Sequence, residues 1–501
     1  MHATLRALIA AVAGSVMAIW VGMGIANETY FSATLVCMVC VWALLAWIGG
    51  PLPEAWVLAA ALFGYVIGNR GFAQLSLSSR LPLLPAEVAL MAGIAGIIIS
   101  GAMHKTSAIR RDALNFSIIA WILIGAARVL PDMRVNGAVA LRDFATVYYA
   151  LFFFIAQSFA VHAQSARLLR RVLFAALVLL PFTYFLYGQF AEFFLTRLTV
   201  RNTPLLYYKD DLVAAFLFAA FFFIIAAPHW SVFLRAGLAT TAFASAFTID
   251  SSRAALVGLV VTSVWWAVAR RLSPLKLQAA IVPAGVLVLL VVAFVSRENF
   301  NNSRIYQLYE HVASIADVTG TRRYTSESRE FIGNNNRFRM WWWRSVAEQT
   351  WEEGPVFGLG FGADLADRFT RTYELDLGEE FHARSPHSIF FTVLGRMGIA
   401  GLLAFLCLTA AMTLRTLRAA RMARIDDKAI VPLGWWSVAW MVFVSGWFGV
   451  VLEGPMGAVL FWTALGMANA ETGAMTTAEP QAEVTAEPST PSNEELAVAR
   501  G

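Results

Sequence analysis

The chain has 501 residues and a formal net charge of +5; 58% of its residues are hydrophobic and only 14% are charged. Soluble domains contain roughly half apolar and about a quarter charged residues. The composition therefore excludes a soluble globular protein, a disordered protein and a small disulfide-stabilised scaffold. The modest positive charge is typical of the cytoplasmic loops of a membrane protein and does not indicate nucleic-acid binding.

Apolar runs recur along almost the whole chain. A helix that crosses a bilayer needs about 20 mostly apolar residues. Fourteen runs approach this length, near residues 7–25, 31–48, 53–68, 85–103, 113–129, 144–161, 172–190, 212–227, 232–249, 253–269, 278–296, 388–412, 431–450 and 454–470. We therefore predict an all-α polytopic membrane protein with about 14 transmembrane helices.

The basic residues indicate which helix ends face the cytoplasm. With the N-terminus inside, sixteen Lys and Arg residues fall in the inner segments and nine in the short outer loops. This distribution agrees with the positive-inside rule. It places the long hydrophilic segment 297–386 outside, which in a Gram-negative cell is the periplasm.

The sequence divides into four parts. They are transmembrane helices 1–11 in residues 1–296, a periplasmic loop domain in 297–386, helices 12–14 in 387–470 and a disordered cytoplasmic tail in 471–501. The tail is rich in Glu, Pro, Thr and Ala and poor in apolar residues. In the loop, residues 304–318 and 338–352 have helical periodicity. Residues 354–362, here called the Gly-rich segment, precede a weaker helical run at 363–373.

Arg253 follows Asp250 closely, at the predicted outer end of a span. A charge in this position needs a partner or contact with water. One interpretation is that Arg253 pairs with Asp250 and extends its guanidinium toward the headgroups. The other is an anion site, in which the free amides and the dipole at the helix N-terminus assist Arg253.

The loop contains Arg337, Arg339 and Arg344 close to Trp341. On a helix, Arg337 and Trp341 share a face because they are four residues apart. Two interpretations stay open for the aromatic cluster formed by Trp341, Trp342, Trp343 and Trp351. Its Trp side chains lie at the level of the lipid headgroups, or they stack on sugar rings.

His387 lies directly before a predicted span that continues with Gly395, Gly398 and Gly401. Glycines spaced in this way allow another helix to approach closely. A helix N-terminus disfavours the imidazolium form, so the ring would stay neutral, as a general base requires. A purely structural His is the alternative. No cluster of His, Cys and carboxylate residues has the spacing of metal ligands, so we expect no metal and no other cofactor.

Five motifs occur in a fixed order and on one predicted side of the membrane. They are Ser251-Ser252-Arg253-Ala254, Arg337-x3-Trp341, Gly354-Pro355-Val356-Phe357-Gly358-Leu359-Gly360-Phe361-Gly362, His387-Ser388 and Gly395-x2-Gly398-x2-Gly401. Over residues 250–410, this order resembles the O-antigen ligase/O-antigen polymerase superfamily of bacterial surface-polysaccharide assembly. Ser388 stands where the family commonly has Asn, and Gly354 stands where Asn often precedes Pro.

The resemblance implies a GT-C-like architecture in the bacterial inner membrane and a metal-independent, inverting glycosyltransferase. The donor would be a polyprenyl-diphosphate-linked glycan and the acceptor a hydroxyl of a glycan or lipid. Other polysaccharide-assembly proteins are candidate partners. By resemblance, Arg253 and Arg337 would contact the diphosphate, and His387 would accept the acceptor's proton. Further candidates for substrate binding are Arg339, which could replace Arg337, and Arg344, Trp341, Tyr207, Tyr208 and Lys209.

Three functions are compatible with this pattern. An exopolysaccharide or O-antigen polymerase is favoured because the loop is large and acidic and shows no basic groove for a phosphorylated core. An O-antigen ligase, which transfers the glycan to lipid A-core or protein, is the first alternative. A transporter or flippase is the alternative of another class, and it predicts ionisable residues in mid-span and broken helices.

Overall fold

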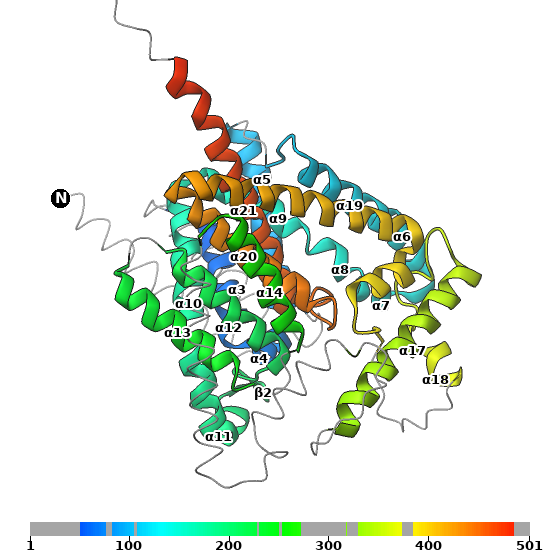
Figure 1. Ribbon diagram of the computed structural model, residues 1–501. Helices are drawn as coiled ribbons and strands as arrows, with labels where there is room; N and C mark the ends of the chain where they lie inside the picture. Colours follow the sequence, from blue (N-terminus) through cyan, green and yellow to red (C-terminus); the bar gives the residue numbers. More distant parts are fainter. Residues whose placement is uncertain are drawn as a thin grey trace, which may run out of the picture.

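The computed structural model describes residues 51–76, 83–104, 108–227, 230–249, 253–271, 317, 329–372 and 384–484. Almost all of its regular structure is helical (Figure 1). The first helices are α3 (Pro53–Ile67), α4 (Asn69–Gln74), α5 (Pro85–His104), α6 (Ala113–Asn136), α7 (Ala138–Asp143), α8 (Ala145–Tyr148), α9 (Leu151–Val161), α10 (Ala163–Gln189) and α11 (Ala191–Thr196). They are followed by α12 (Asp210–Ile225), α13 (Val232–Ala246), α14 (Arg253–Val268), α17 (Arg329–Glu353), α18 (Asp367–Thr372), α19 (Ile389–Ile425), the 3-10 helix η2 (Asp427–Ala429), α20 (Ile430–Ser445) and α21 (Pro455–Val484). Two short strands, β1 (Thr199–Val200) and β2 (Thr203–Pro204), pair antiparallel, with Val200 opposite Thr203.

Several of these helices can cross a membrane. In the described part of the chain, four are long and apolar enough: α6, α10, α19 and the run from Asp427 to Ser445. A fifth candidate is the pair Ala138–Tyr148 and Leu151–Val161, which is bent by 41°. The predicted runs 7–25, 31–48 and 278–296 lie outside the described residues. An α-helical membrane protein is therefore supported, whereas the count of 14 spans and the GT-C-like architecture stay predictions.

The centre of the bundle is formed by α12, α20 and α21. Every residue from Leu212 to Ile224 in α12 is buried, and α20 is buried along its length. A helix that is apolar on all sides avoids water only when other helices or lipid surround it. The sequence of α12, with five Phe and no charge after Asp211, thus explains its central position.

The outer face of α6 carries an apolar stripe. Phe116, Leu123 and Leu130 are seven residues apart, which places them on one side of the helix, and they are 57%, 62% and 68% exposed. Large exposed apolar surfaces are unusual in soluble monomers. This stripe is suited to contact with lipid tails.

Residues 329–372 of the loop form a small helical unit beside the start of α19 (Figure 1). The helix predicted at 338–352 is confirmed by α17, whereas the predicted run 363–373 is shortened to α18. Buried Trp342 stacks on Phe369 and joins the two helices. The predicted helix at 304–318 lies outside the described residues, except for residue 317, which is not helical.

The predicted start of the disordered tail, at residue 471, lies too early in the chain. α21 continues to Val484, well beyond the expected boundary at Glu471. The Glu471 carboxylate accepts a hydrogen bond from Arg170 of α10 at 2.7 Å, and buried Thr472 accepts one from the Trp436 indole. Glu471 and Thr472 are polar and would favour disorder if they had no partners, but side chains from distant helices bind them here. Residues 485–501 lie outside the described part.

Candidate active site

The Gly-rich segment packs against a break in α19. The break lies at Gly398, whose φ of 63° is not helical. Beyond it, the amides of Ile399 and Ala400 donate to the carbonyl groups of Pro355 and Val356 at 2.9 and 3.0 Å. Amides at the start of a helix have no partner within the helix. The Gly-rich segment supplies these partners and fixes the loop to the start of the second half of α19.

Hydrogen bonds to charged side chains hold the other side of the same segment. The Asp132 and Asp143 carboxylates accept hydrogen bonds from the amides of Phe361 and Gly362 at 2.7 and 3.0 Å. Arg396 of α19, which is only 4% exposed, forms an ion pair with Asp143 at 2.8 Å. A buried guanidinium needs such a partner because loss of water is costly. The segment is therefore held between α6, α7 and α19.

Gly360→Ala is expected to destabilise the protein by more than about 1 kcal/mol, because Ala is strained where φ is positive. Gly360 has φ of 99°, and an added Cβ would lie 2.5 Å from the Arg128 guanidinium and 2.6 Å from the Asp132 carboxylate. Thermal unfolding of the purified protein in detergent measures the effect. Gly188→Ala is the matched control, since nothing lies within 4 Å of its added Cβ. Equal unfolding temperatures for both variants would contradict the prediction.

His387 lies in a turn just before α19. Its φ of 55° is left-handed, which is uncommon for a residue other than Gly. Contacts on the neighbouring residues hold the turn: the Trp343 indole donates to the Pro386 carbonyl at 2.6 Å, and Ser385 donates to Glu453 at 2.7 Å. Strained backbone persists where the surroundings fix it, and it is common at functional sites.

The surroundings of His387 keep its imidazole neutral. Burial, followed by the nearby cations Arg339 and Lys209, lowers the pKa of His387 to about 4, although Asp211 acts in the opposite direction. A neutral ring agrees with the sequence-based expectation. The causes differ, however, because burial and the two cations account for the shift rather than a helix N-terminus.

Arg253 and Arg339 lie close to one another beside this turn. Arg253 begins α14 and donates to the Asn336 side chain of α17 at 2.9 Å. Burial and the nearby Arg253 lower the pKa of Arg339 to about 10, so both groups remain cationic at neutral pH. The structure thus brings Arg339 and Lys209 near His387, with Arg253 next to Arg339. These three cations are called the cationic group. The alternative partner Asp250 lies outside the described residues.

The other candidates on α17 face elsewhere. Arg337 is exposed, and Trp341 is 45% exposed. The side chain of Arg344 is 75% exposed and pairs with Glu348, one turn further along the helix. Successive helical residues point about 100° apart, because 3.6 residues make one turn. The geometry therefore favours Arg339 over Arg337 at the site and does not bring Arg344 or Trp341 into it.

Of the three candidates before α12, only Lys209 belongs to this group. The Arg70 guanidinium lies 5.0 Å from the centre of the Tyr207 ring. Tyr208 is 5% exposed and packs inside the bundle. The Lys209 ammonium group pairs with Asp211 at 3.4 Å. The contacts of Tyr207 and Tyr208 are with other parts of the bundle, and their role in substrate binding stays a prediction.

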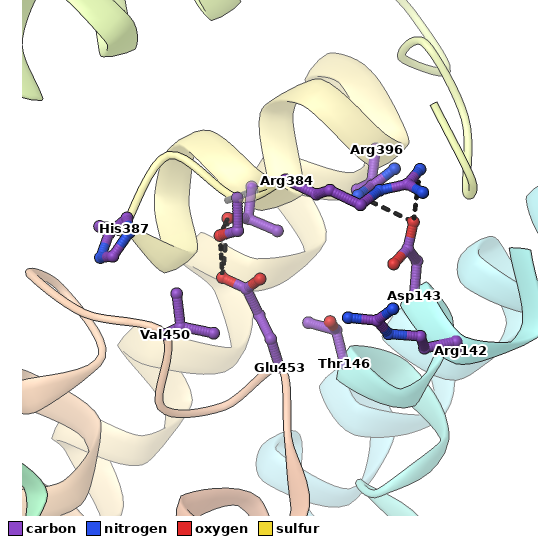
Figure 2. A pocket seen from close by; sticks show the side chains of 10 residues that line it. Arg142, Asp143, Thr146, Arg384, His387, Arg396, Val450 and Glu453 are labelled. Carbon is purple, nitrogen blue, oxygen red and sulfur yellow. Dashed lines mark hydrogen bonds and ion pairs between the residues drawn. The ribbon is translucent and has the colours of Figure 1, made fainter. Parts of the chain in front are cut away.

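A polar cavity of about 220 Å³ opens on one side of His387 (Figure 2). Residues that are far apart in sequence line it: Arg142, Asp143, Thr146, Arg384, Ser385, His387, Thr392, Arg396, Val450 and Glu453. Burial raises the pKa of Glu453, against the effect of hydrogen bonds from Ser385 and Thr392. The sequence analysis did not predict the residues that line this cavity. Charged residues in or between apolar spans, such as Arg396 and Glu453, were the available signal.

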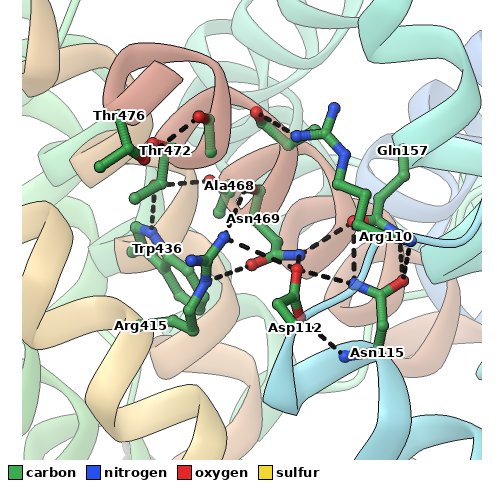
Figure 3. Close-up of polar contacts among 12 residues, drawn as sticks. Arg110, Asp112, Asn115, Gln157, Arg415, Trp436, Ala468, Asn469, Thr472 and Thr476 are labelled. Atoms are coloured by element: carbon green, nitrogen blue, oxygen red, sulfur yellow. Dashed lines mark hydrogen bonds and ion pairs between the residues drawn. The ribbon is translucent and has the colours of Figure 1, made fainter. Parts of the chain in front are cut away.

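A second polar cluster joins α6, α9, α19 and α21 (Figure 3). At its centre, the fully buried Asn469 side chain accepts from Arg415 at 2.7 Å and donates to Gln157 at 2.9 Å and to Asp112 at 3.1 Å. Because its central polar groups satisfy one another, this cluster is suited to joining helices rather than to binding a ligand. Neither cluster contains three His, Cys, Asp or Glu residues arranged for a metal ion, and none was found elsewhere in the described ranges.

The apolar helices, the helical loop segment and the cationic group around a neutral His define a multi-pass α-helical membrane protein with a polar site at a helix boundary. Residues 238–406, about a third of the chain, match the family described as O-antigen ligase. This match confirms the resemblance to the O-antigen ligase/polymerase superfamily and includes Arg253, Arg339 and His387. A search of curated proteins found no match.

Proposed function

We propose that this protein is a membrane glycosyltransferase that moves a glycan from a polyprenyl diphosphate carrier to an acceptor hydroxyl. We place the reaction at the periplasmic face of the bacterial inner membrane. The grouping of Arg253, Arg339 and Lys209 beside neutral His387 carries this proposal. The family match supports an O-antigen ligase- or polymerase-type function.

In the proposed reaction, the acceptor oxygen bonds to the anomeric carbon and the bond from that carbon to the diphosphate breaks. The diphosphate leaves with the electron pair, and His387 takes the hydroxyl proton. Negative charge grows on the leaving group, so cations already held in place stabilise the transition state. Arg253, Arg339 and Lys209 supply this charge without a metal. Attack opposite to the leaving group inverts the anomeric configuration.

Within this class we favour an exopolysaccharide or O-antigen polymerase. The loop carries fourteen acidic and eleven basic residues, which does not suit a phosphorylated acceptor. A ligase for lipid A-core or protein is the alternative. A transporter is also a candidate, since α19 is broken at Gly398 and buries Arg396.

Deletion of the gene, followed by sizing of surface glycans, tests the proposal. Loss of long chains with single repeat units retained indicates a polymerase, whereas unattached carrier-linked polymer indicates a ligase. Transfer by the purified protein in detergent separates both from a transporter, because no compartments exist there. Unchanged surface glycans and no transfer in detergent would refute the glycosyltransferase proposal.

Binding of the donor is expected to raise the pKa of His387, because the diphosphate would neutralise Arg339 and Lys209, which lower it in the free protein. Below its pKa the imidazole is protonated and cannot accept a proton, so the rate falls as the pH falls through that value. The acid limb of kcat/KM, which reports the free enzyme, should lie near pH 4. The limb of kcat, which reports the complex, should lie at higher pH. Coincident limbs in the two pH profiles would contradict this coupling.

A further inference from the structure

The cavity beside His387 is distinct from the cationic group. Arg253, Arg339 and Lys209 do not line it. His387 lies at one end of the cavity, with Arg142, Asp143 and Arg396 toward the other (Figure 2). The imidazole is therefore in contact with two environments, which suits a base that must meet both an acceptor and a donor.

Most charged side chains in this cavity have an ion-pair or hydrogen-bond partner within the protein. Arg396 pairs with Asp143 at 2.8 Å, and Arg384 donates to the Gly362 carbonyl at 2.5 Å. Glu453 accepts from Ser385 and Thr392 at 2.7 and 2.9 Å. The mixed hydrogen-bond donors and acceptors of this cavity suit the hydroxyl groups of a sugar.

Arg142 differs from the other charged residues of the cavity in its contacts. Among the residues that the structure describes, none forms a hydrogen bond or ion pair with its side chain. Its guanidinium points toward the cavity (Figure 2), and Arg142 is exposed at the end of α7. It therefore presents hydrogen-bond donors to a molecule that enters.

The size of the cavity limits the occupant. Its volume of about 220 Å³ lies below the range of about 300–1,000 Å³ that is usual for sites of drug-sized ligands. One sugar ring fits this space better than a lipid chain or several sugar units.

We propose that this cavity binds the acceptor through one monosaccharide unit, and that Arg142 donates hydrogen bonds to the oxygen atoms of that sugar. This inference rests on the proposed glycosyltransferase function. It places the attacking hydroxyl next to His387, which removes its proton while the oxygen bonds to the anomeric carbon and the diphosphate leaves. The donor diphosphate is then held by the cations outside the cavity.

The test measures transfer by the full-length protein in detergent. The donor is the carrier-linked repeat unit extracted from a gene-deletion strain. The acceptor is whichever substrate the wild type uses, the same carrier-linked unit or lipid A-core purified from that strain. Arg142→Gln should raise the KM for the acceptor about ten- to hundredfold, the effect of losing a charged hydrogen bond. The kcat and the affinity for added polyprenyl diphosphate should stay near wild type.

Two variants make the result specific. Arg142→Lys keeps the charge but loses the planar fork, so its KM should lie between those of Arg142→Gln and the wild type. Arg134→Gln is the matched control, since Arg134 is an exposed Arg at the end of α6 that does not line the cavity. An acceptor KM unchanged in Arg142→Gln, or an equal loss of affinity for polyprenyl diphosphate, would overturn the inference.

His387→Asn separates failure of this inference from failure of the proposed function. Loss of transfer in His387→Asn with a normal acceptor KM in Arg142→Gln rejects only the acceptor cavity. Normal transfer in His387→Asn, or no transfer by the wild type to either acceptor, rejects the mechanism on which the inference rests.

Discussion

His387→Ala should reduce glycan transfer by a factor of about 10² to 10⁴, the usual contribution of a general base. The imidazole is held neutral by burial and by the nearby cations. It lies at the end of the polar cavity and beside the cationic group. Ala leaves the cavity and the cationic group in place and removes the proposed proton acceptor. Single-turnover transfer from a carrier-linked donor measures the chemical step directly.

The backbone at His387 requires a second variant. Its φ of 55° is left-handed, and Ala in that region adds strain that could reduce transfer by itself. Asn, like His, adopts this conformation more often than most residues with a Cβ, yet its amide cannot act as a base. His387→Asn should therefore lose transfer to a similar extent while unfolding at the wild-type temperature. His162→Ala, at the start of α10, controls for loss of a His elsewhere. Substantial transfer by folded His387→Asn would reject the role of base.

The sequence alone was sufficient to predict those helices that are determined by a local pattern of apolar residues. Helical periodicity at 338–352 correctly predicted most of α17. The three consecutive Trp residues in this helix then point in different directions: Trp341 outward, Trp342 into the loop unit and Trp343 against Phe391 of α19. A single role for the whole cluster, at the lipid headgroups or against sugar rings, could not be correct. Its three consecutive members point to different sides within one helical turn.

The cavity could not be predicted in this way. Asp143 and Arg396 are 253 positions apart in sequence, yet their side chains pair at 2.8 Å. The Gly-rich segment contacts both regions, at Asp143 and at the residues that follow the break at Gly398. Neither periodicity nor spacing encodes such a long-range contact. A buried charge in an apolar run shows only that a partner must exist, without showing which one.

Arg339→Ala should reduce transfer by a factor of about 10² to 10³, the cost of removing one preorganised group that stabilises charge in a transition state. Arg337→Ala should have a much smaller effect. Burial and the proximity of Arg253 support a place for Arg339 in the proposed site, whereas Arg337 is exposed. The motif that pairs Arg337 with Trp341 points to a different face of α17, because residues two apart on a helix do not face the same side.

The comparison of these two substitutions is informative because they lie on one helix and remove the same side chain. Arg339→Lys should retain part of the activity, since an ammonium keeps the charge but cannot bind two phosphate oxygens in a planar fork. Arg344→Ala serves as a third reference, because Arg344 is exposed and pairs with Glu348. If Arg337→Ala lost more transfer than Arg339→Ala, α17 would have to present its other face to the donor. The grouping of Arg253, Arg339 and His387 would then describe a resting arrangement rather than the one that reacts.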